Sequence, residues 1–299
     1  MALLDRAIVR LLPAVPRPVV QRLSSRYIAG PNLDDAIRVV SRLNAKGKLA
    51  TIDVLGEEIA SADEARAIAG QYHDVLARLD EEKLDANISI KLTALGLELD
   101  LGLCRENLEA IVVDAAVRGR FVRIDMEDSS TTDRTLALHR QLREEGHENV
   151  GVVLQAYLRR TLEDIAGLDN VRICKGIYVE PADLALQEFD EVRASYVRCL
   201  EALVAQGTYV GIATHDEHLI GEALRIVGDG GLAPDRYEFQ MLLGVRPDRA
   251  DELVADGHRL RVYVPYGTDW YGYSVRRLQE NPKIAGYVAR DLASRAFRR

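Results

Sequence analysis

The sequence predicts an α/β protein built on a parallel sheet, and three observations lead to this class. Short apolar runs rich in β-branched residues recur along the chain, and amphipathic stretches of helical length separate them. About eight such units follow one another at roughly 30 residues each. Repeated strand–helix units favour a parallel sheet with crossover helices, and eight units in about 250 residues match a (βα)8 TIM-type barrel better than an open doubly wound sheet.

The chain begins with helical elements. Three prolines within residues 13–18 interrupt the first apolar stretch, so a short helix followed by a break is expected there. Residues 33–45 then repeat apolar positions at helical spacing. We therefore expect extra N-terminal helices, with a helical arm over residues 1–45 and one barrel domain over residues 46–299.

The barrel elements are expected to alternate along the rest of the chain. The apolar runs predict strands at 50–55, 87–92, 120–125, 150–156, 171–177, 208–213, 236–241 and 260–265. Helices are expected over 62–79, 105–118, 133–145, 183–206, 217–227, 247–257 and, after the last strand, 268–281. The unit between the fourth and fifth strands is short, and residues 161–168 leave room for little more than about two helical turns.

Composition and charge exclude several classes of protein. The 299 residues are 47% hydrophobic and 29% charged, which is typical of a globular chain and not of a disordered one. A formal net charge of -8 without a basic run argues against a nucleic-acid partner. No apolar stretch reaches the roughly 20 residues of a membrane span. We expect a cytoplasmic protein, with the amphipathic residues 1–20 as its peripheral contact to the inner face of the cell membrane.

Polar side chains gather where the predicted strands end. In a (βα)8 barrel the chemistry lies at the carboxyl ends of the strands, so these side chains are expected to converge on one pocket. No GxGxxG or GxxxxGK[ST] motif is present, so any nucleotide cofactor must be held in another way. The strand-end residues are Asp53, Lys91, Asp125, Glu127, Asp128, Gln155, Lys175, Thr214, His215, Gln240, Tyr263 and Tyr266.

Seven stretches at these strand ends resemble the proline dehydrogenase family, in its small monofunctional bacterial form. They are SIKLTALG (89–96), RIDMEDS (123–129), VVLQAYLRR (152–160), RICKGIYVEP (172–181), ATHDEHLI (213–220), YEFQMLLGVR (237–246) and VYVPYGTDWYGYSVRRLQENP (262–282). The resemblance implies a distorted barrel whose last helix caps the substrate and which binds FAD non-covalently. It also implies oxidation of L-proline to Δ1-pyrroline-5-carboxylate, with a hydride passing from proline C5 to flavin N5 and the electrons passing to a membrane quinone.

The resemblance assigns one set of residues to the substrate. Arg276 and Arg277 would grip the proline carboxylate, because a guanidinium fork binds a carboxylate through two hydrogen bonds. Lys91 would add a third cation. Asp125 would act in catalysis by holding these cations and by drawing the substrate amine towards its neutral form. The other expected substrate contacts are Tyr178, Tyr263, Tyr273 and Glu280.

A second set of residues resembles the flavin contacts of the family. Arg172 and Lys175 would stabilise an electron-rich reduced flavin, and Arg172 is also expected to act in catalysis. The other expected cofactor contacts are Met126, Gln155, Gly176, Ile177, Thr214 and His215, with Ile177 standing where family members usually have Ala. No metal is expected, since the residues around THDEH (214–218) do not complete a metal-binding helix.

A second class of function fits the same barrel. A lysine at a strand end can form a Schiff base, so a lyase or aldolase that uses Lys91 or Lys175 is the alternative to a flavoenzyme. A flavin spectrum in the purified protein distinguishes the two classes, since an aldolase has none. The flavoenzyme is expected to work with a separate pyrroline-5-carboxylate dehydrogenase.

Overall fold

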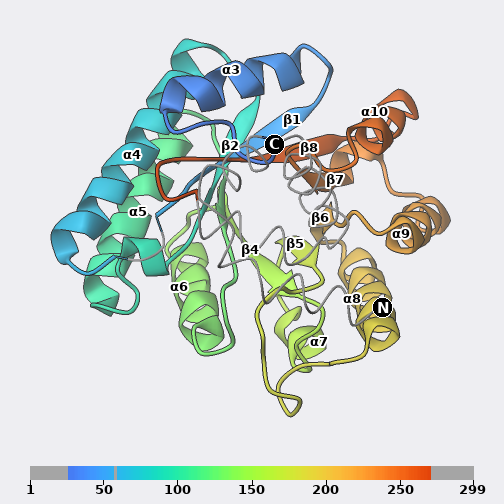
Figure 1. Cartoon of the computed structure of the whole chain (residues 1–299). Coiled ribbons are helices and arrows are strands. Elements are labelled where there is room, and N and C mark those ends of the chain that lie inside the picture. Colours follow the sequence, from blue (N-terminus) through green and yellow to red (C-terminus); the bar gives the residue numbers. More distant parts are fainter. Residues whose placement is uncertain (1–25, 57–58, 271–299) are drawn as a thin grey trace, which may run out of the picture.

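The computed structural model of the chain describes residues 26–56 and 59–270. Eight strands form a closed barrel in the order β1 to β8, all neighbouring pairs are parallel, and β1 closes the ring by pairing with β8 (Figure 1). The predicted (βα)8 barrel is therefore confirmed. The strands are β1 (Leu49–Val54), β2 (Ala86–Ile90), β3 (Val122–Ile124), β4 (Val150–Gln155), β5 (Asn170–Cys174), β6 (Tyr209–Ala213), β7 (Tyr237–Leu242) and β8 (Leu260–Tyr266).

Helices follow the strands around the outside of the barrel. Two short 3-10 turns, η2 (Thr93–Leu95) and η3 (Pro234–Arg236), follow β2 and precede β7. The connection between β4 and β5 carries one turn of helix, which is within the roughly two turns expected from its length. The α-helices are α3 (Leu33–Asn44), α4 (Ala62–Glu81), α5 (Leu101–Val117), α6 (Thr132–Glu144), α7 (Thr161–Asp164), α8 (Phe189–Gln206), α9 (Glu217–Asp229) and α10 (Pro247–Ala255).

The helix expected over 183–206 is shorter than predicted, because α8 begins only at Phe189. The residues before it are bound to the loop after β4. Leu186 N donates to Tyr157 O at 2.8 Å, and Ala185 pairs with Leu158 in an antiparallel bridge. These tertiary hydrogen bonds hold the backbone in a conformation that a helix would not allow.

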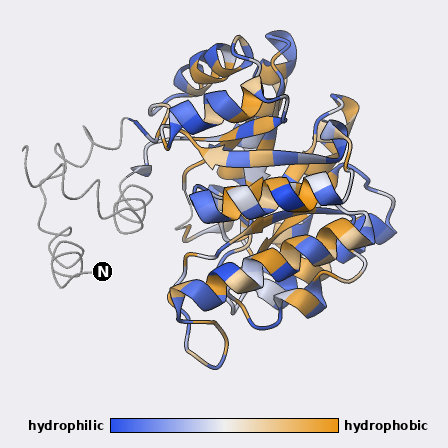
Figure 2. Ribbon diagram, turned by 90° about the vertical axis from the view of Figure 1, so that its right-hand side faces the viewer, coloured by the Kyte–Doolittle hydropathy of each residue, from blue (hydrophilic) through white to orange (hydrophobic). Residues whose placement is uncertain are grey.

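The pairing register divides the side chains of the sheet into two sets, because directly paired residues point to the same side. Ile52 pairs with Ile88, and both are fully buried in the apolar core. Asp53 pairs with Ser89, which pairs in turn with Arg123 on β3. Apolar residues thus face the helices, which carry alternating hydrophobic and hydrophilic bands in Figure 2. The alternate residues line a polar barrel interior.

Helix α3 covers the seam at which the barrel closes. It contacts both β8 and β1 and buries Ala36, Ile37 and Val40. This is where the helix after the last strand stands in a regular barrel. Most of the helix expected at 268–281, and most of the expected N-terminal arm, lie outside the described residues. Within the part of the chain that the structure describes, no helix is long and apolar enough to cross a lipid bilayer.

Candidate active site

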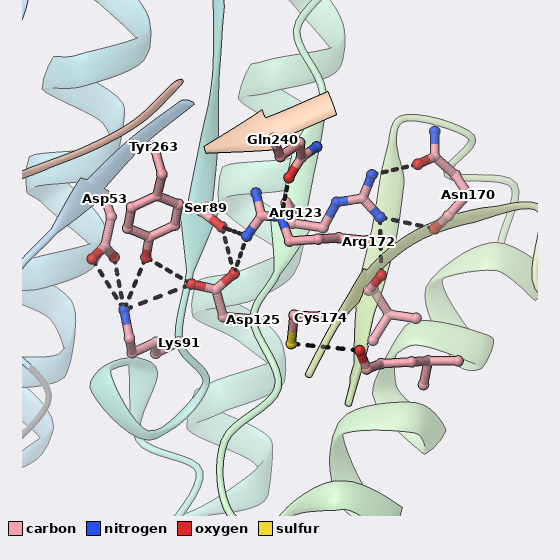
Figure 3. A network of polar contacts seen from close by, with 12 residues as sticks. Asp53, Ser89, Lys91, Arg123, Asp125, Asn170, Arg172, Cys174, Gln240 and Tyr263 are labelled. Atoms are coloured by element: carbon pink, nitrogen blue, oxygen red, sulfur yellow. Dashed lines mark hydrogen bonds and ion pairs between the residues drawn. The ribbon is translucent and has the colours of Figure 1, made fainter. Parts of the chain in front are cut away.

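A cluster of charged side chains lies inside the barrel at the carboxyl ends of its strands (Figure 3). Lys91 Nζ donates to both carboxylate oxygens of Asp53, at 3.0 and 3.1 Å, and to the Tyr263 hydroxyl at 3.3 Å. Asp53 is fully buried, and Lys91 is 9% exposed. Burying two charges costs several kcal/mol per ion, roughly, unless close pairing and further hydrogen bonds offset the loss of water. The cluster therefore depends on its internal contacts.

Asp53 is a member of this cluster that the resemblance does not single out. The Tyr72 hydroxyl lies 3.4 Å from Asp53 Oδ1 and donates to Ser89 O at 2.9 Å. Burial and then the Asp53 charge raise the pKa of Tyr72, so this hydroxyl stays protonated. The sequence contains a signal for this pair, because an acidic residue, Asp53, ends one predicted strand and a lysine, Lys91, ends the next. Asp53 thus belongs to the expected strand-end set and holds the Lys91 ammonium.

Asp125, directly after β3, is the centre of the cluster. Its Oδ1 accepts from the Ser89 hydroxyl at 2.6 Å and from Arg172 Nη1 at 2.7 Å, and its Oδ2 accepts from the Tyr263 hydroxyl at 2.8 Å. Lys91 Nζ lies 3.7 Å from Oδ2. Burial would raise the pKa of Asp125, but the charges of Arg172 and Lys91 and these hydrogen bonds outweigh burial and lower it. The carboxylate therefore stays ionised between two cations.

Arg172 reaches from β5 across the barrel interior to Asp125. Its Nη1 also donates to Ser89 Oγ at 3.0 Å, and its Nε donates to Gln240 Oε1 at 2.5 Å. The guanidinium lies over the Tyr263 ring, 5.4 Å from the centroid. Its Nη2 is buried and has no hydrogen-bond partner in the described structure. A buried donor without a partner is costly, and such atoms are found where a further group binds.

The ends of β4 and β6 place two uncharged polar groups beside Arg172 in the barrel order. Gln155 is 2% exposed, and its Nε2 donates to Glu127 O at 2.6 Å. His215 accepts through Nε2 from Leu242 N at 2.8 Å, which assigns the proton to Nδ1 in the neutral ring. Both side chains are oriented by backbone atoms of the neighbouring strand ends.

Lys175, directly after β5, is a partly exposed cation of the mouth. Its side chain is 36% exposed, and its Nζ lies 3.9 Å from Asp216 and 5.2 Å from the centroid of the Phe189 ring. Thr214 is buried, and its Oγ1 accepts from Asp216 N at 3.2 Å. An ammonium with a distant acidic neighbour and an open face is suited to bind an anionic group.

Gly176 follows Lys175 at a point where no other residue fits. Its φ is +103°, a conformation that L side chains rarely adopt. A Cβ at this position would lie 2.0 Å from the Tyr157 ring. The loop backbone is therefore packed directly on that ring.

The same loop is tied to the turn after β3. Ser129 donates to the Glu180 carboxylate through its backbone N at 2.7 Å and through its hydroxyl at 2.6 Å. The half-buried Ile177 and Tyr178 are thus carried on a segment fixed at both ends. Met126 is buried under the β3 turn, at 7% exposed.

The structure brings four expected residues into direct contact: Lys91, Asp125, Arg172 and Tyr263. The expected cofactor contacts come from β3 to β6 and the loops that follow them, next to this cluster in the barrel order. Four expected substrate contacts lie outside the described residues, namely Tyr273, Arg276, Arg277 and Glu280.

The charges of the cluster bear on what chemistry is possible. Lys91 lies between Asp53 and Asp125, and two carboxylates favour the charged ammonium, whereas a Schiff base forms from a neutral amine. The end of β5 carries two cationic side chains, Arg172 with its Nη2 lacking a hydrogen-bond partner among the described residues and the partly exposed Lys175. Two neighbouring cationic donors fit an electron-rich ring with anionic groups, such as a flavin nucleotide. The arrangement favours binding of a small zwitterion beside a redox cofactor.

Within residues 26–56 and 59–270, one group of side chains has the spacing of metal ligands. It consists of Glu109, Glu145 and His147, none of which ends a strand. Arg105 already pairs with both glutamates, at 3.1 and 2.7 Å. This group carries no argument for a metal in the reaction.

One family model matches most of this chain, and curated relatives carry the same family description. The family model described as "Proline dehydrogenase" matches residues 36–180 and 182–290. "Proline dehydrogenase 1" of Bacillus subtilis subsp. natto is 39% identical over 271 residues, which cover 89% of this chain and 89% of the relative. "Proline dehydrogenase" of Deinococcus radiodurans is 37% identical over 300 residues, which cover 94% of this chain and 96% of the relative.

A solved structure supports the fold. The crystal structure of proline utilization A (PutA) from Bdellovibrio bacteriovorus inactivated by N-propargylglycine matches with a TM-score of 0.83. The match covers 92% of this chain and 36% of that one at 24% sequence identity. The barrel is thus shared with part of a longer protein.

Proposed function

Because the chain belongs to the proline dehydrogenase family, it is an oxidoreductase that acts on proline in proline catabolism, and we propose that it uses non-covalently bound FAD to form Δ1-pyrroline-5-carboxylate from L-proline. The observation that carries this proposal is the sequence of contacts Lys91–Asp125–Arg172. The buried Asp125 carboxylate contacts both Lys91, which is suited to bind the substrate carboxylate, and Arg172, whose Nη2 donor has no partner in the described part of the chain. Substrate and cofactor would therefore meet over a single rigid cluster.

The proposed substrate site binds proline through its carboxylate and its ring. Lys91, Arg276 and Arg277 supply the positive charges for the carboxylate. Proline is small, so these charge-assisted contacts fix its position more than apolar contact does. The residues proposed to surround the ring and exclude water are Tyr178, Tyr263 and Tyr273. Glu280 is proposed as an acidic partner near the substrate and the flavin.

Asp125 has two expected roles, and its surroundings favour one of them. Ser89, Arg172 and Tyr263 all donate to this carboxylate, and the lowered pKa makes it a weak proton acceptor. We therefore propose that Asp125 acts by holding Lys91 and Arg172 in place. Capture of a proton from the substrate amine is disfavoured.

The residues that fit FAD lie on the neighbouring strands. When bound, the flavin supplies the hydride acceptor that no side chain offers. Arg172 places a fixed positive charge in the site, and Lys175 provides a second one. The glycine at position 176 keeps the loop backbone close to the barrel. The remaining proposed contacts are Met126, Gln155, Ile177, Thr214 and His215.

We further propose that the electrons pass to a membrane quinone and that the protein works in the cytoplasm, in contact with the inner face of the cell membrane. The amphipathic residues 1–20 are the proposed contact. The product would pass to a separate pyrroline-5-carboxylate dehydrogenase.

The visible spectrum of the purified protein tests the proposal. We expect bound flavin that loses its oxidised absorption when L-proline is added without oxygen. The alternative, a Schiff-base lyase, predicts a colourless protein that borohydride traps covalently with its carbonyl substrate. Folded protein that takes up no FAD, or FAD that proline does not reduce, would contradict the proposal.

A further inference from the structure

Gln240 is a strand-end residue to which the proposed reaction gives no role. It lies on β7, is 6% exposed, and points into the barrel interior towards Arg172 (Figure 3). Its Oε1 accepts from Arg172 Nε at 2.5 Å, and its Nε2 donates to Glu238 Oε1 at 2.6 Å. Both ends of the amide are therefore used, and each has a charged partner.

Glu238 is held on the other side by a second set of donors. Arg261 Nε donates to Glu238 Oε1 at 2.7 Å, and Arg261 Nη2 donates to Oε2 at 3.0 Å. The Tyr209 hydroxyl donates to Oε2 at 3.0 Å. Burial would raise the pKa of Glu238, but the Arg261 charge and the hydrogen bonds from Arg261, Gln240 and Tyr209 outweigh it and lower the pKa to about 2. Glu238 is thus an ionised carboxylate that can only accept.

The charge of Glu238 determines which way the amide of Gln240 faces. An ionised carboxylate must be met by the NH2 end of the amide, so the carbonyl end must face Arg172. A flipped amide would place two acceptors together on one side and two donors together on the other. The order Arg261, Glu238, Gln240, Arg172 therefore alternates donors and acceptors through the barrel interior.

We infer that Gln240 is a positioning residue, which Glu238 orients and which holds the Arg172 guanidinium in the rotamer that presents Nη1 to Asp125 and leaves Nη2 for the cofactor. This inference rests on the proposed function, because it assigns Arg172 to the flavin. Nε is the nitrogen nearest the Arg172 side-chain stem, and an acceptor there fixes the guanidinium plane. Asp125 and Ser89 hold only Nη1.

The neighbouring strand leaves room for this arrangement. Gly211 lies on β6, where it pairs with Glu238, and a Cβ there would lie 2.5 Å from Gln240 Nε2 and 2.9 Å from Gln240 Cδ. Gly211 has no positive φ that would require glycine for the backbone. The absence of a side chain at this position is therefore explained by the space that Gln240 occupies.

The test compares two variants with the parent, each loaded with FAD. Gln240→Met keeps the length of the side chain and removes both hydrogen bonds. Gly211→Ala keeps Gln240 and displaces it sterically. The readouts are the midpoint potential of the bound flavin and the separate kcat and KM for proline with a quinone analogue. Thermal unfolding of each variant establishes that it is folded.

We expect both variants to lower kcat about 10- to 100-fold, because a loosened cation stabilises the reduced cofactor less. KM for proline should stay within about threefold, because Gln240 contacts none of the proposed carboxylate ligands. The flavin potential should become more negative, by about 30 mV for each tenfold change in the equilibrium of a two-electron couple.

A matched control separates positioning from loss of a buried hydrogen bond. Asn107 is 9% exposed on α5 and donates to Leu95 O at 3.0 Å, outside the barrel interior. Asn107→Leu should lower the melting temperature and leave the flavin potential unchanged. Folded Gln240→Met or Gly211→Ala with the parental potential and kcat would overturn the inference. Parent enzyme whose flavin proline does not reduce would instead overturn the proposed function.

Discussion

The two halves of the barrel mouth use their polar residues in different ways. In the half formed by β1, β2, β3 and β8, Asp53, Lys91, Asp125 and Tyr263 bind one another within 3.7 Å; we call this the substrate half. In the half formed by β4 to β6, Gln155, Lys175, Thr214 and His215 bind backbone atoms or a carboxylate 3.9 Å away; we call this the cofactor half.

We propose that this difference reflects how each half prepares for its ligand. The substrate half has its charges already fixed, so a small zwitterion can replace water without rearranging them. The cofactor half contains the partly exposed Lys175 and a loop whose conformation requires glycine at position 176. This suits a large ligand that supplies the missing contacts when it binds. Arg172 belongs to both halves, because it holds Asp125 with one nitrogen and leaves another unpaired.

The largest effect is expected when the central charge of the substrate half, the Asp125 carboxylate, is removed. Asp125→Asn keeps the shape of the side chain but leaves Lys91 and Arg172 without their shared carboxylate. We expect flavin reduction by proline to slow about 100- to 1000-fold while FAD stays bound. Anaerobic rapid mixing measures the rate. Asp114→Asn, at an ion pair with Arg118 on the outer helix α5, should stay within about twofold of the parent.

The paired arginines give the next largest expected effect. Arg276→Met or Arg277→Met should raise KM for proline and lower kcat/KM about 30- to 1000-fold, because a charge-assisted contact of roughly 2–4 kcal/mol is lost. Arg→Lys should recover only part of the loss, since an ammonium cannot form the fork. Steady-state kinetics on flavin-loaded variants check this. If both Met variants stay within about threefold of the parent, the proposed carboxylate site is wrong.

A backbone change at Gly176 should act mainly on the cofactor half. In Gly176→Ala, the Cβ meets the Tyr157 ring at 2.0 Å in a backbone conformation that alanine disfavours. The loop must move, so we expect about tenfold weaker FAD binding, measured by flavin fluorescence during dilution. At saturating FAD, KM for proline should rise less than the dissociation constant of FAD, because Tyr178 is the one proposed substrate contact on this loop. Gly119 also has a positive φ, +64°, but open space around its Cβ, so Gly119→Ala should bind FAD with the affinity of the parent.

The smallest functional effect is expected at His139, which lies on the buried face of α6, outside the barrel interior. Burial and the charges of Arg123 and Arg143 lower its pKa from 6.5 to about 4. Because the pKa of His139 is lower in the folded than in the unfolded chain, a falling pH protonates this imidazole in the unfolded chain first and so favours unfolding. Stability is therefore full above pH 6.5 and declines between pH 6.5 and 4, by roughly 3 kcal/mol.

Urea unfolding at several pH values measures this decline. His139→Leu should remove much of the slope between pH 6.5 and 4 and leave FAD and proline binding at pH 7 unchanged. An identical slope in the variant would show that other groups cause the acid sensitivity.

The barrel could be predicted from the sequence because strand and helix periodicities are local and repeat eight times. The contact of Lys91 with Asp125 and of Asp125 with Arg172 follows from the same pattern, since strand ends converge. The start of α8 at Phe189 could not be predicted, because bonds from Leu186 and Ala185 to the loop after β4 override local helical spacing.

The contacts that Gln240 and Glu238 make across the barrel interior could not be predicted from the sequence. Gln240 meets Arg172 from a strand two places away, and Glu238 and Arg261 meet below them. Which alternate residues meet depends on the register and tilt with which the strands close the ring. No spacing along the chain contains that information.

The division of the mouth is tested most directly by measuring two affinities on two lysine variants. Lys91→Met and Lys175→Met are titrated with FAD and, when saturated with FAD, with a non-oxidisable carboxylate analogue of proline. The account predicts a crossed result. Lys91→Met should weaken the analogue at least about tenfold and leave FAD affinity near that of the parent, and Lys175→Met should do the reverse. Equal losses of both affinities in either variant would contradict a mouth divided into a substrate half and a cofactor half.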